Sequence, residues 1–237
     1  MLPHPDCTNE QMLDLRESVM ITSPDELYSF VKKIGFIPFF KNDIPGFSVE
    51  EHTPDCFWFK KGVLGVWEWK DRYIESGQLI YGKFLNKKSA LISKDWFPYF
   101  ASYRRNGYDF DALYDDGMAS YENKTLIDVI DAKAPLSSKI LRSIFANLKP
   151  AKLDYMLTDL MMQTYVCIRS FDYWIAKDGH QYGWGIAIYD FPEKIIGYDF
   201  ATSKYEEDPS VCHNILLNHL NELHPYADLG KLKKIIR

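Results

Sequence analysis

A helical segment runs directly into two strand-like segments between residues 152 and 190, and this arrangement limits the possible folds more than any other feature of the chain. The strand-like segments "YVCIRSFDYW" and "QYGWGIAIY" are rich in β-branched and aromatic residues and flank a Lys-Asp-Gly turn. The segment before them, "KLDYMLTDLMMQT", has apolar residues at spacings of three and one, which is typical of a helix with one buried face. These apolar residues are Leu153, Met156, Leu157, Leu160 and Met161. We therefore expect a helix that packs against the base of a two-stranded ribbon.

Two further helices are expected before this segment, at residues 123–134 and 136–148. One face of the second carries Ile140, Leu141, Ile144, Phe145 and Leu148. Three helices followed by a hairpin is the order of elements in a winged helix. The sequence therefore predicts an α+β fold of winged-helix type, with a three-helix bundle and a β-hairpin wing. An N-terminal α+β part that contains a second hairpin precedes it.

The first half of the chain begins with a helix that the sequence marks at both ends. Ser23 suits the N-cap, Pro24 the first position, Glu26 completes a capping box, and Gly35 is a natural stop. Residues 78–93 then read as a hairpin with its turn at "NKK". We expect three domains: an N-terminal α+β region at residues 1–122, a winged-helix module at 123–192, and a C-terminal helix with a basic tail, "GKLKKIIR", at 193–237.

Charge is distributed unevenly along the chain. The net charge is −5, which argues against a protein that is coated with nucleic acid. From Lys139 onward there are 12 Lys and Arg residues and 12 Asp and Glu residues, so the negative excess lies in the first 138 residues. Contact with a polyanion is therefore expected to favour the second half.

Cysteine usage and the start of the chain indicate the compartment. The four cysteines are scattered, without a Cys-x-x-Cys pair, so we expect neither a metal site nor a disulfide framework, and no cofactor. His219 and His224 are five residues apart and do not share a helix face, which disfavours a zinc site there. There is no signal-like start and no apolar run of membrane-spanning length. We expect a cytoplasmic protein with no membrane partner.

Two stretches of the chain resemble a known family. The segment "APLSSKIL", followed by "KLDYMLTDLMMQTYVCI", resembles the winged-helix repeat of AlkZ-type DNA glycosylases, the YcaQ-like proteins. The segment "LIYGKFLNKKSALISKDWFPYFASYRR" is also similar to a hairpin and Pro-containing segment of that family. This chain is shorter than those enzymes, so the resemblance points to the short AlkZ-related proteins.

The resemblance implies winged-helix units around a hairpin, a concave basic surface, and excision of alkylated bases from DNA. The family places its catalytic Gln-x-Gln or Gln-x-Asp motif just after a Leu-Gly pair that ends an early helix. In this chain Ile34-Gly35 occupies that place, so Pro38 and Phe40 stand where the two polar residues are expected. Neither side chain can activate water or stabilise an oxocarbenium-like sugar. The resemblance therefore predicts a relative that lacks the catalytic motif, and excision activity is not carried over.

Basic residues of the predicted module are the candidates for contact with duplex or damaged DNA. A recognition helix would enter the major groove, and the wing would reach phosphate or the minor groove. On the same helix Asp154 and Asp159 would repel phosphate, so the alternative is a wing docked on its own first half with solvated charges. The adjacent Arg104 and Arg105 suit either a phosphate clamp or a charged helix end. The candidate nucleic-acid-binding residues are Arg142, Lys152, Arg169, Lys177, His180, Arg104 and Arg105.

A carboxylate between two tryptophans is the candidate for catalysis. Glu68 stands between Trp67 and Trp69, and a carboxylate held among aromatic rings can have a raised pKa and act as an acid or base. The alternative is that both tryptophans belong to the core. Three functions therefore stay open: nucleic-acid binding, a protein-binding winged-helix module, or an enzyme that uses Glu68 in an aromatic pocket. The sequence leaves open whether the chain is an enzyme.

Overall fold

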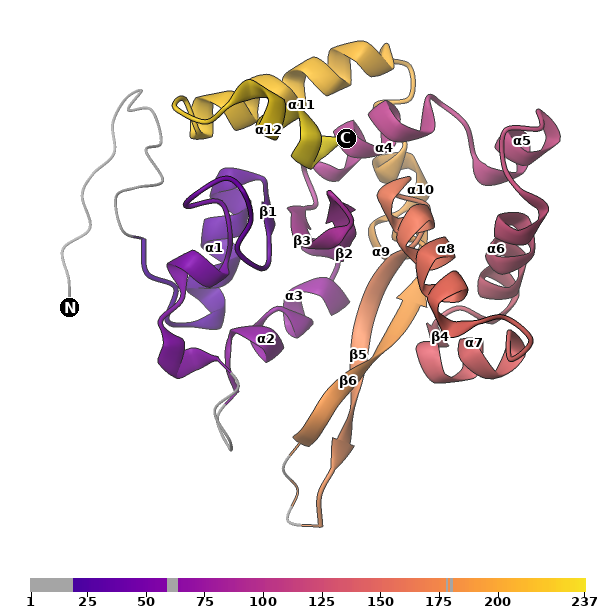
Figure 1. The fold of residues 1–237 in the computed structure, drawn as a ribbon, viewed down its shortest axis with the longest axis horizontal. Coiled ribbons are helices and arrows are strands. Elements are labelled where there is room, and N and C mark those ends of the chain that lie inside the picture. Colours follow the sequence, from indigo (N-terminus) through magenta and orange to yellow (C-terminus); the bar gives the residue numbers. More distant parts are fainter. Residues whose placement is uncertain (1–18, 59–63, 178, 180) are drawn as a thin grey trace.

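One antiparallel sheet connects the two halves of the chain. The structure is a computed structural model that describes residues 19–58, 64–177, 179 and 181–237 (Figure 1). In this part of the chain the sheet has six strands in the order β1-β3-β2-β5-β6-β4, and each pair of neighbours is antiparallel. The strands are β1 Phe36–Pro38, β2 Leu79–Leu85, β3 Lys88–Ser93, β4 Leu136–Ser137, β5 Cys167–Ile175 and β6 Gln181–Asp190.

Helices surround this sheet (Figure 1), and α1, α6, α7, α8 and α11 lie where the sequence predicts helices. In the first half they are α1 Pro24–Ile34, α2 Val66–Trp69, α3 Asp71–Glu75, α4 Phe97–Arg105 and α5 Phe110–Asp115, with 3-10 turns η1 Glu50–His52 and η2 Asp55–Phe57. In the second half they are α6 Tyr121–Lys133, α7 Ser138–Ile144, α8 Pro150–Met162, α9 Pro192–Ile196, α10 Tyr198–Ala201, α11 Pro209–Leu223 and α12 Leu229–Ile236. The fold thus combines helices with an antiparallel sheet, as predicted, and the winged-helix type stays a prediction.

The predicted N-cap at the start of α1 is present, but the Glu26 carboxylate bonds to a different backbone amide than a capping box requires. The Ser23 hydroxyl accepts a hydrogen bond from the Glu26 amide at 3.3 Å, as an N-cap does. The Glu26 carboxylate, however, accepts from the amide of Thr22 at 2.7 Å, one residue before the N-cap. The Thr22 hydroxyl also donates to this carboxylate at 2.7 Å, and the hydroxyl, followed by the amide, lowers the pKa of Glu26. The helix then ends at Gly35, whose φ of +85° lies in the region that favours glycine.

Both predicted hairpins are present and are joined to each other. Asn86 and Lys87 have φ values of 47° and 61°, as the two central residues of a type I′ turn require, and connect β2 to β3. The ribbon β5–β6 pairs with β2 at Tyr81↔Ile168, so the strands of both halves belong to one sheet. The predicted division into three domains stays a prediction.

The order α6–β4–α7–α8–β5–β6 matches the expected helices and hairpin, with one added strand. The apolar face of α8 is buried, as predicted, and α8 packs over β2, where the Lys83 ammonium donates to the Thr158 hydroxyl at 3.1 Å. On α7 the expected apolar face is wrong in part, because Leu141 is buried while Ile140 and Ile144 are exposed. The reason is that α7 has only seven residues, of which Leu141 is buried where the helix packs against β4 and β6.

The C-terminal part packs on the first half. Helix α11 packs against α4, and α12 packs against α11 and β2. In Figure 1 these two helices lie at the end of the molecule opposite the far end of the β5–β6 ribbon. The basic tail noted in the sequence is therefore α12, a helix with Leu232, Ile235 and Ile236 buried.

Buried tyrosines predict how the fold responds to alkali. Burial, together with a hydrogen bond donated to Asp25, raises the pKa of Tyr73 to about 12, and burial raises the pKa of Tyr189 to about 12. Burial also raises the pKa of Tyr81 and Tyr173. A raised pKa in the folded state stabilises the fold below pH 10, the value in the unfolded chain, and that contribution is lost as the pH rises from 10 toward 12. We expect cooperative unfolding in this window, followed by circular dichroism, with tyrosinate absorbance rising in the same step. Tyrosinate absorbance that reaches its full value while the circular dichroism of the fold is retained would contradict it.

Candidate nucleic-acid interface

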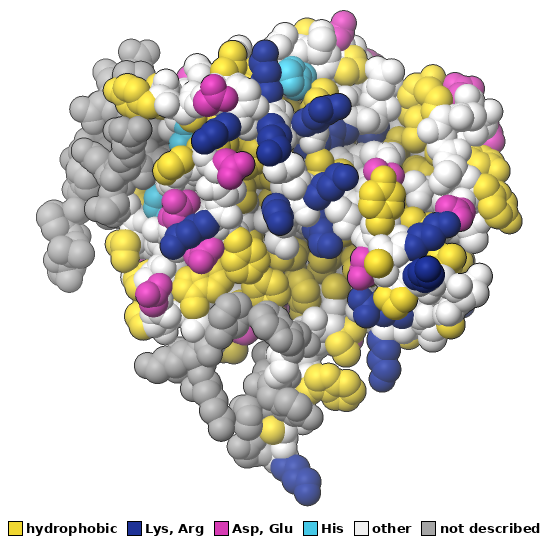
Figure 2. All heavy atoms as spheres, in the orientation of Figure 1, with side chains coloured by type: hydrophobic (Ala, Val, Ile, Leu, Met, Phe, Trp, Pro, Cys, Tyr) yellow, Lys and Arg dark blue, Asp and Glu magenta, His cyan; other side chains and the backbone are white. Residues whose placement is uncertain are grey.

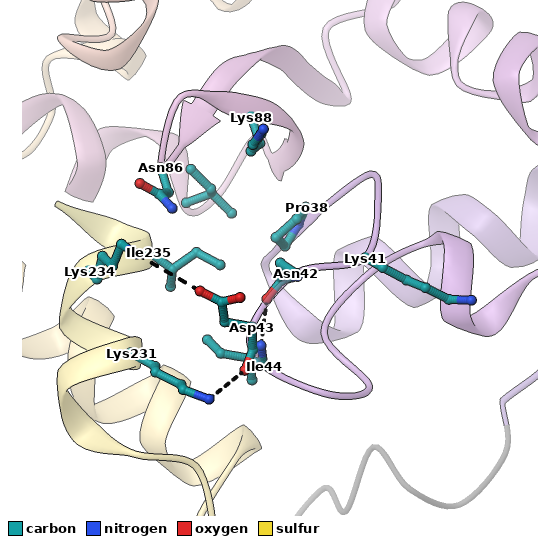
Figure 3. A pocket seen from close by; sticks show the side chains of 11 residues that line it. Pro38, Lys41, Asn42, Asp43, Ile44, Asn86, Lys88, Lys231, Lys234 and Ile235 are labelled. Carbon is teal, nitrogen blue, oxygen red and sulfur yellow. Dashed lines mark hydrogen bonds and ion pairs between the residues drawn. The ribbon is translucent and has the colours of Figure 1, made fainter.

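A hollow of about 200 Å³ lies where three segments far apart in the sequence meet (Figure 3). They are the loop at residues 41–44, the turn between β2 and β3, and helix α12. Four lysines and one carboxylate are among the lining residues. The lining consists of Pro38, Lys41, Asn42, Asp43, Ile44, Leu85, Asn86, Lys88, Lys231, Lys234 and Ile235. We call this feature the basic hollow.

The loop on one side of the basic hollow is held by its own side chains. The Asn42 side chain accepts from the Ile44 amide at 2.9 Å and donates to the Phe47 carbonyl at 2.6 Å, which closes the loop. The carboxylates of Glu50 and Glu51 accept from backbone amides of the same loop at 2.8 and 2.9 Å. These carboxylates are therefore used within the loop, and the lysine at its start, Lys41, is exposed.

Helix α12 presents two lysines to the other side. The Lys231 ammonium donates to the Asp43 carbonyl at 3.2 Å, and the Lys234 ammonium lies 3.9 Å from the Asp43 carboxylate (Figure 3). The Asp43 and Lys234 side chains are 72% and 63% exposed, so this pair is weak and a ligand can compete with it. Asp228 caps α12 and accepts from the Lys231 amide at 3.0 Å.

Arg104 joins α12 to strand β2 through hydrogen bonds to both elements. Its Nη2 donates to the Phe84 carbonyl on β2 at 2.6 Å and to the Ile236 carbonyl on α12 at 2.9 Å. Burial lowers the pKa of Arg104 to about 10, so the guanidinium is still a cation at neutral pH. Its Nε and Nη1 have no hydrogen-bond partner among the described residues. Arg104 thus adds positive charge beneath the same face, on which Figure 2 shows Lys and Arg side chains gathered over α12 and the β2–β3 hairpin.

Arg105 points the other way and is also internal. Arg105 is only 4% exposed. Its Nε donates to the Thr164 hydroxyl at 3.0 Å. Its Nη1 donates to the Tyr205 hydroxyl at 2.9 Å and forms an ion pair with the Glu193 carboxylate. Burial is the largest single influence on the pKa of Arg105 and lowers it. Glu193 and Tyr205 together outweigh burial, so the pKa is raised. Both arginines of the suggested phosphate clamp are therefore turned into the protein.

The other predicted DNA contacts lie apart from the basic hollow. Arg142 pairs with Asp154 at 3.3 Å, and Lys152 pairs with Glu122. Arg169 pairs at 2.8 Å with Asp190, whose carboxylate is buried. Lys177 is exposed beyond the end of β5, and His180 lies outside the described residues. These residues stay candidates for DNA contact, and three of them form ion pairs with carboxylates of the protein.

Glu68 has a structural partner in this fold. Its carboxylate accepts from the Gly65 amide at 2.8 Å, so it caps the short helix α2. Trp69 donates its indole N–H to the Leu64 carbonyl at 2.9 Å, and Trp67 packs against the rings of Tyr81 and Phe171. None of these three residues lines the basic hollow.

Lys70 lies inside a cluster of aromatic rings formed by Trp67, Tyr81 and Phe171, and the sequence did not indicate this position. We call these rings the aromatic cluster. The Lys70 side chain is fully buried, with Nζ 4.2 Å from the ring centre of Trp67 and 4.3 Å from that of Phe171. The ammonium also donates to the Asp71 carboxylate at 2.9 Å, and Tyr173 donates to the other oxygen of that carboxylate at 2.8 Å. Burial lowers the pKa of Lys70, and Asp71 opposes this shift. The cluster ties α2 and α3 to the β5–β6 ribbon.

The lysines of the basic hollow were also missed as a group. The sequence showed a basic tail and a Lys-Lys turn, but nothing in their spacing places residues 41, 88 and 231 together. In the described part of the chain, no helix is both long and apolar enough to cross a membrane. The cytoplasmic location stays a prediction.

Fold and site together define a mixed α/β protein with a basic hollow between a β-hairpin and its last helix. A family model described as AlkZ related matches residues 21–237, nearly the whole described chain. The chain therefore belongs to the AlkZ-related family, and the resemblance drawn from its motifs is confirmed. No curated protein and no solved structure matches it.

Replacing Arg105 tests whether it is a structural group. The change R105M leaves the Glu193 carboxylate, which is 17% exposed, without its guanidinium partner. We expect the free energy of unfolding in urea to fall by about 3 kcal/mol. The double variant R105M/E193L removes both charges and is expected to lose less than R105M alone.

The matched control is R72M, because the Arg72 side chain is 68% exposed and lies 3.6 Å from Asp25. A change of less than about 1 kcal/mol is expected there. Equal losses for R105M and R72M would show that the buried pair does not hold the fold.

Proposed function

We propose that this protein binds duplex DNA through the face around the basic hollow and does so without excising bases. The observation that supports this most strongly is the surplus of four lysines over one carboxylate among the lining residues, in a chain whose net charge is −5. A local positive surface is what phosphate contact requires, and the net charge of the whole chain does not prevent it. The family relationship supports DNA as the polyanion.

The arrangement of the second half supports a winged-helix module beside this face. The order α6–β4–α7–α8–β5–β6 is that of a winged helix, and β4 pairs with β6 at Leu136↔Tyr189, as the first strand of such a module pairs with the wing. Helix α8 packs over β2, the strand that leads to the Lys88 turn. A duplex that lies on the lysines of the basic hollow can therefore extend toward Lys152 on α8, with Lys177 on the wing as a further contact. A damaged or distorted duplex bends more readily, which lets it meet the lysines of the hollow and those of α8 and the wing together.

The position of Pro38 supports the loss of excision. Pro38 lines the basic hollow, and its backbone carbonyl accepts from the Val49 amide at 3.0 Å. A proline carries no side-chain donor or acceptor, and Phe40 is apolar as well. The side chains at the two motif positions therefore offer no group that can position water at a sugar. The one carboxylate among the lining residues is Asp43, which lies 3.9 Å from the Lys234 ammonium.

A protein-binding role is the second candidate, and one observation favours it. Ile140 and Ile144 of α7 and Trp174 of β5 are exposed, and the Lys139 ammonium lies 5.5 Å from the Trp174 ring centre. Exposed apolar groups of this kind are typical of interaction surfaces when they form one patch. An enzyme that uses Glu68 is not supported, because that carboxylate caps α2.

Charge reversal in the basic hollow tests DNA binding. We expect the double variant K88E/K231E to bind a labelled duplex at least about tenfold more weakly in fluorescence anisotropy, because two phosphate contacts become repulsive. Glu at position 231 lies in the first turn of α12, where a negative charge favours the helix, so the fold is retained.

The matched control is K33E/K133E, which reverses two lysines in the last turns of α1 and α6, outside the hollow. Both variants are titrated with an intact duplex and with one that carries an abasic-site analogue. Equal affinity of the two variants, or no binding by the wild-type protein at low salt, would contradict the proposal.

The proposed loss of excision has its own test. Incubation with a methylated duplex, followed by alkaline cleavage and a denaturing gel, is expected to give no strand breaks above those without protein. A duplex that carries an abasic site from the start checks the detection. Breaks that depend on the protein would overturn this part of the proposal while leaving the binding result intact.

A further inference from the structure

A second cavity, of about 260 Å³, lies on the other side of the molecule from α1 and β1, among α5, α6, α9 and α10 (Figure 1). Its floor includes the buried pair of Arg105 and Glu193. Five aromatic residues line it: Phe110, Tyr165, Phe191, Tyr198 and Tyr205. We call it the aromatic cavity. A volume of this size takes one small group rather than a whole drug-sized ligand.

The charge of the aromatic cavity is opposite to that of the basic hollow. Its lining contains five carboxylates and two cations, a net charge of −3. The carboxylates belong to Asp109, Asp111, Asp128, Asp131 and Glu193. Such a lining repels phosphate and attracts a cation.

Most of these carboxylates have partners inside the protein that a ligand can displace. Asp131 pairs with Lys194 at 2.8 Å, and Asp111 lies 3.2 Å from Lys124, which also pairs with Asp128. The three aspartates are more than half exposed, so each pair contributes about 1 kcal/mol or less. When Lys124 is included, the surroundings keep a net charge of −2.

The rings of the aromatic cavity already hold cations of the protein itself. The Arg105 guanidinium lies 4.6 Å from the ring centre of Tyr165, and the Lys194 ammonium lies 5.0 Å from that of Phe191. Tyr198 lines the cavity and is 59% exposed, so its ring can meet a ligand at the entrance. The same combination of ring faces and carboxylates suits one more cationic group.

We propose that the aromatic cavity binds an organic cation, an alkylammonium or guanidinium group, which Tyr198 contacts with its ring and the aspartates neutralise. Such a group comes either from a free polyamine or from a Lys or Arg side chain of a partner protein. This function goes beyond DNA binding, because it uses a different surface of opposite charge.

The test is isothermal titration of the full chain with three probes at low ionic strength. Spermidine represents a free polyamine, the capped peptide Gly-Arg-Gly represents a protein side chain, and Gly-Gln-Gly is the neutral control. We expect binding of at least one cationic probe, none of the neutral peptide, and a loss of about fivefold in affinity in Y198A. The change D128N is expected to weaken binding as well.

The matched control is Y121A, because Tyr121 is an exposed tyrosine on α6 that does not line the cavity. Binding by spermidine alone assigns the site to a polyamine, and binding by the arginine peptide alone assigns it to a protein partner. No binding of either cation, or equal affinities in Y198A and Y121A, would overturn the proposal. DNA affinity is expected to be the same in Y198A and the wild-type protein, so failure here is distinguishable from failure of the DNA-binding proposal.

Discussion

Two adjacent guanidinium groups at the end of α4 hold the outer parts of this molecule to its sheet. Arg104 joins β2 to the last helix, whereas Arg105 joins α4 to Thr164 after α8 and to Glu193 on α9. Consecutive side chains of a helix point about 100° apart, so the two arginines of one short helix reach two different sides of it. The basic hollow depends on the first arginine and the floor of the aromatic cavity on the second. A buried charge needs partners, and Arg105 has a carboxylate and a hydroxyl, whereas Arg104 has two backbone carbonyls at its Nη2.

Opposite charge on separate surfaces is the main electrostatic property of the protein. Lysines from three segments surround the basic hollow, while aspartates surround the aromatic cavity. Exposed charges act over about 8 Å at physiological ionic strength, so each surface meets its ligand with its own local field. A net charge of −5 therefore says little about either site. The proposed DNA-binding face and the proposed cation-binding cavity lie in one chain, which would allow the protein to bring a basic partner to DNA.

Local signals predicted much of the fold. The Ser23 cap, the hairpin turn at Asn86 and the apolar stripe of α8 each depend on neighbours within a few residues, and all three are present. The stretch "VWEW" forms a helical turn in which the Glu68 carboxylate caps the backbone while Lys70 enters the aromatic cluster, and a catalytic role of Glu68 stays a prediction. The face of α7 was misjudged because its length is too short to bury a full stripe.

Contacts between segments that are far apart in the chain could not be predicted from the sequence. The direction of Arg104 depends on where β2 and α12 lie, and these elements are more than 100 residues apart. The four lysines line one hollow only because the loop at residues 41–44, the β2–β3 hairpin and α12 meet there. Family membership, in contrast, followed from short motifs, since those motifs encode the helices and hairpins that relatives share.

The salt dependence of duplex binding tests the central claim most directly. If the four lysines of the basic hollow contact phosphate, the logarithm of the association constant falls against the logarithm of salt concentration with a slope of about −3 to −4. In K88E/K231E the slope is expected to be shallower by about 2, because two phosphate contacts are lost. A slope that is the same in both proteins would show that DNA lies elsewhere, and binding that does not depend on salt would contradict a phosphate-contacting face.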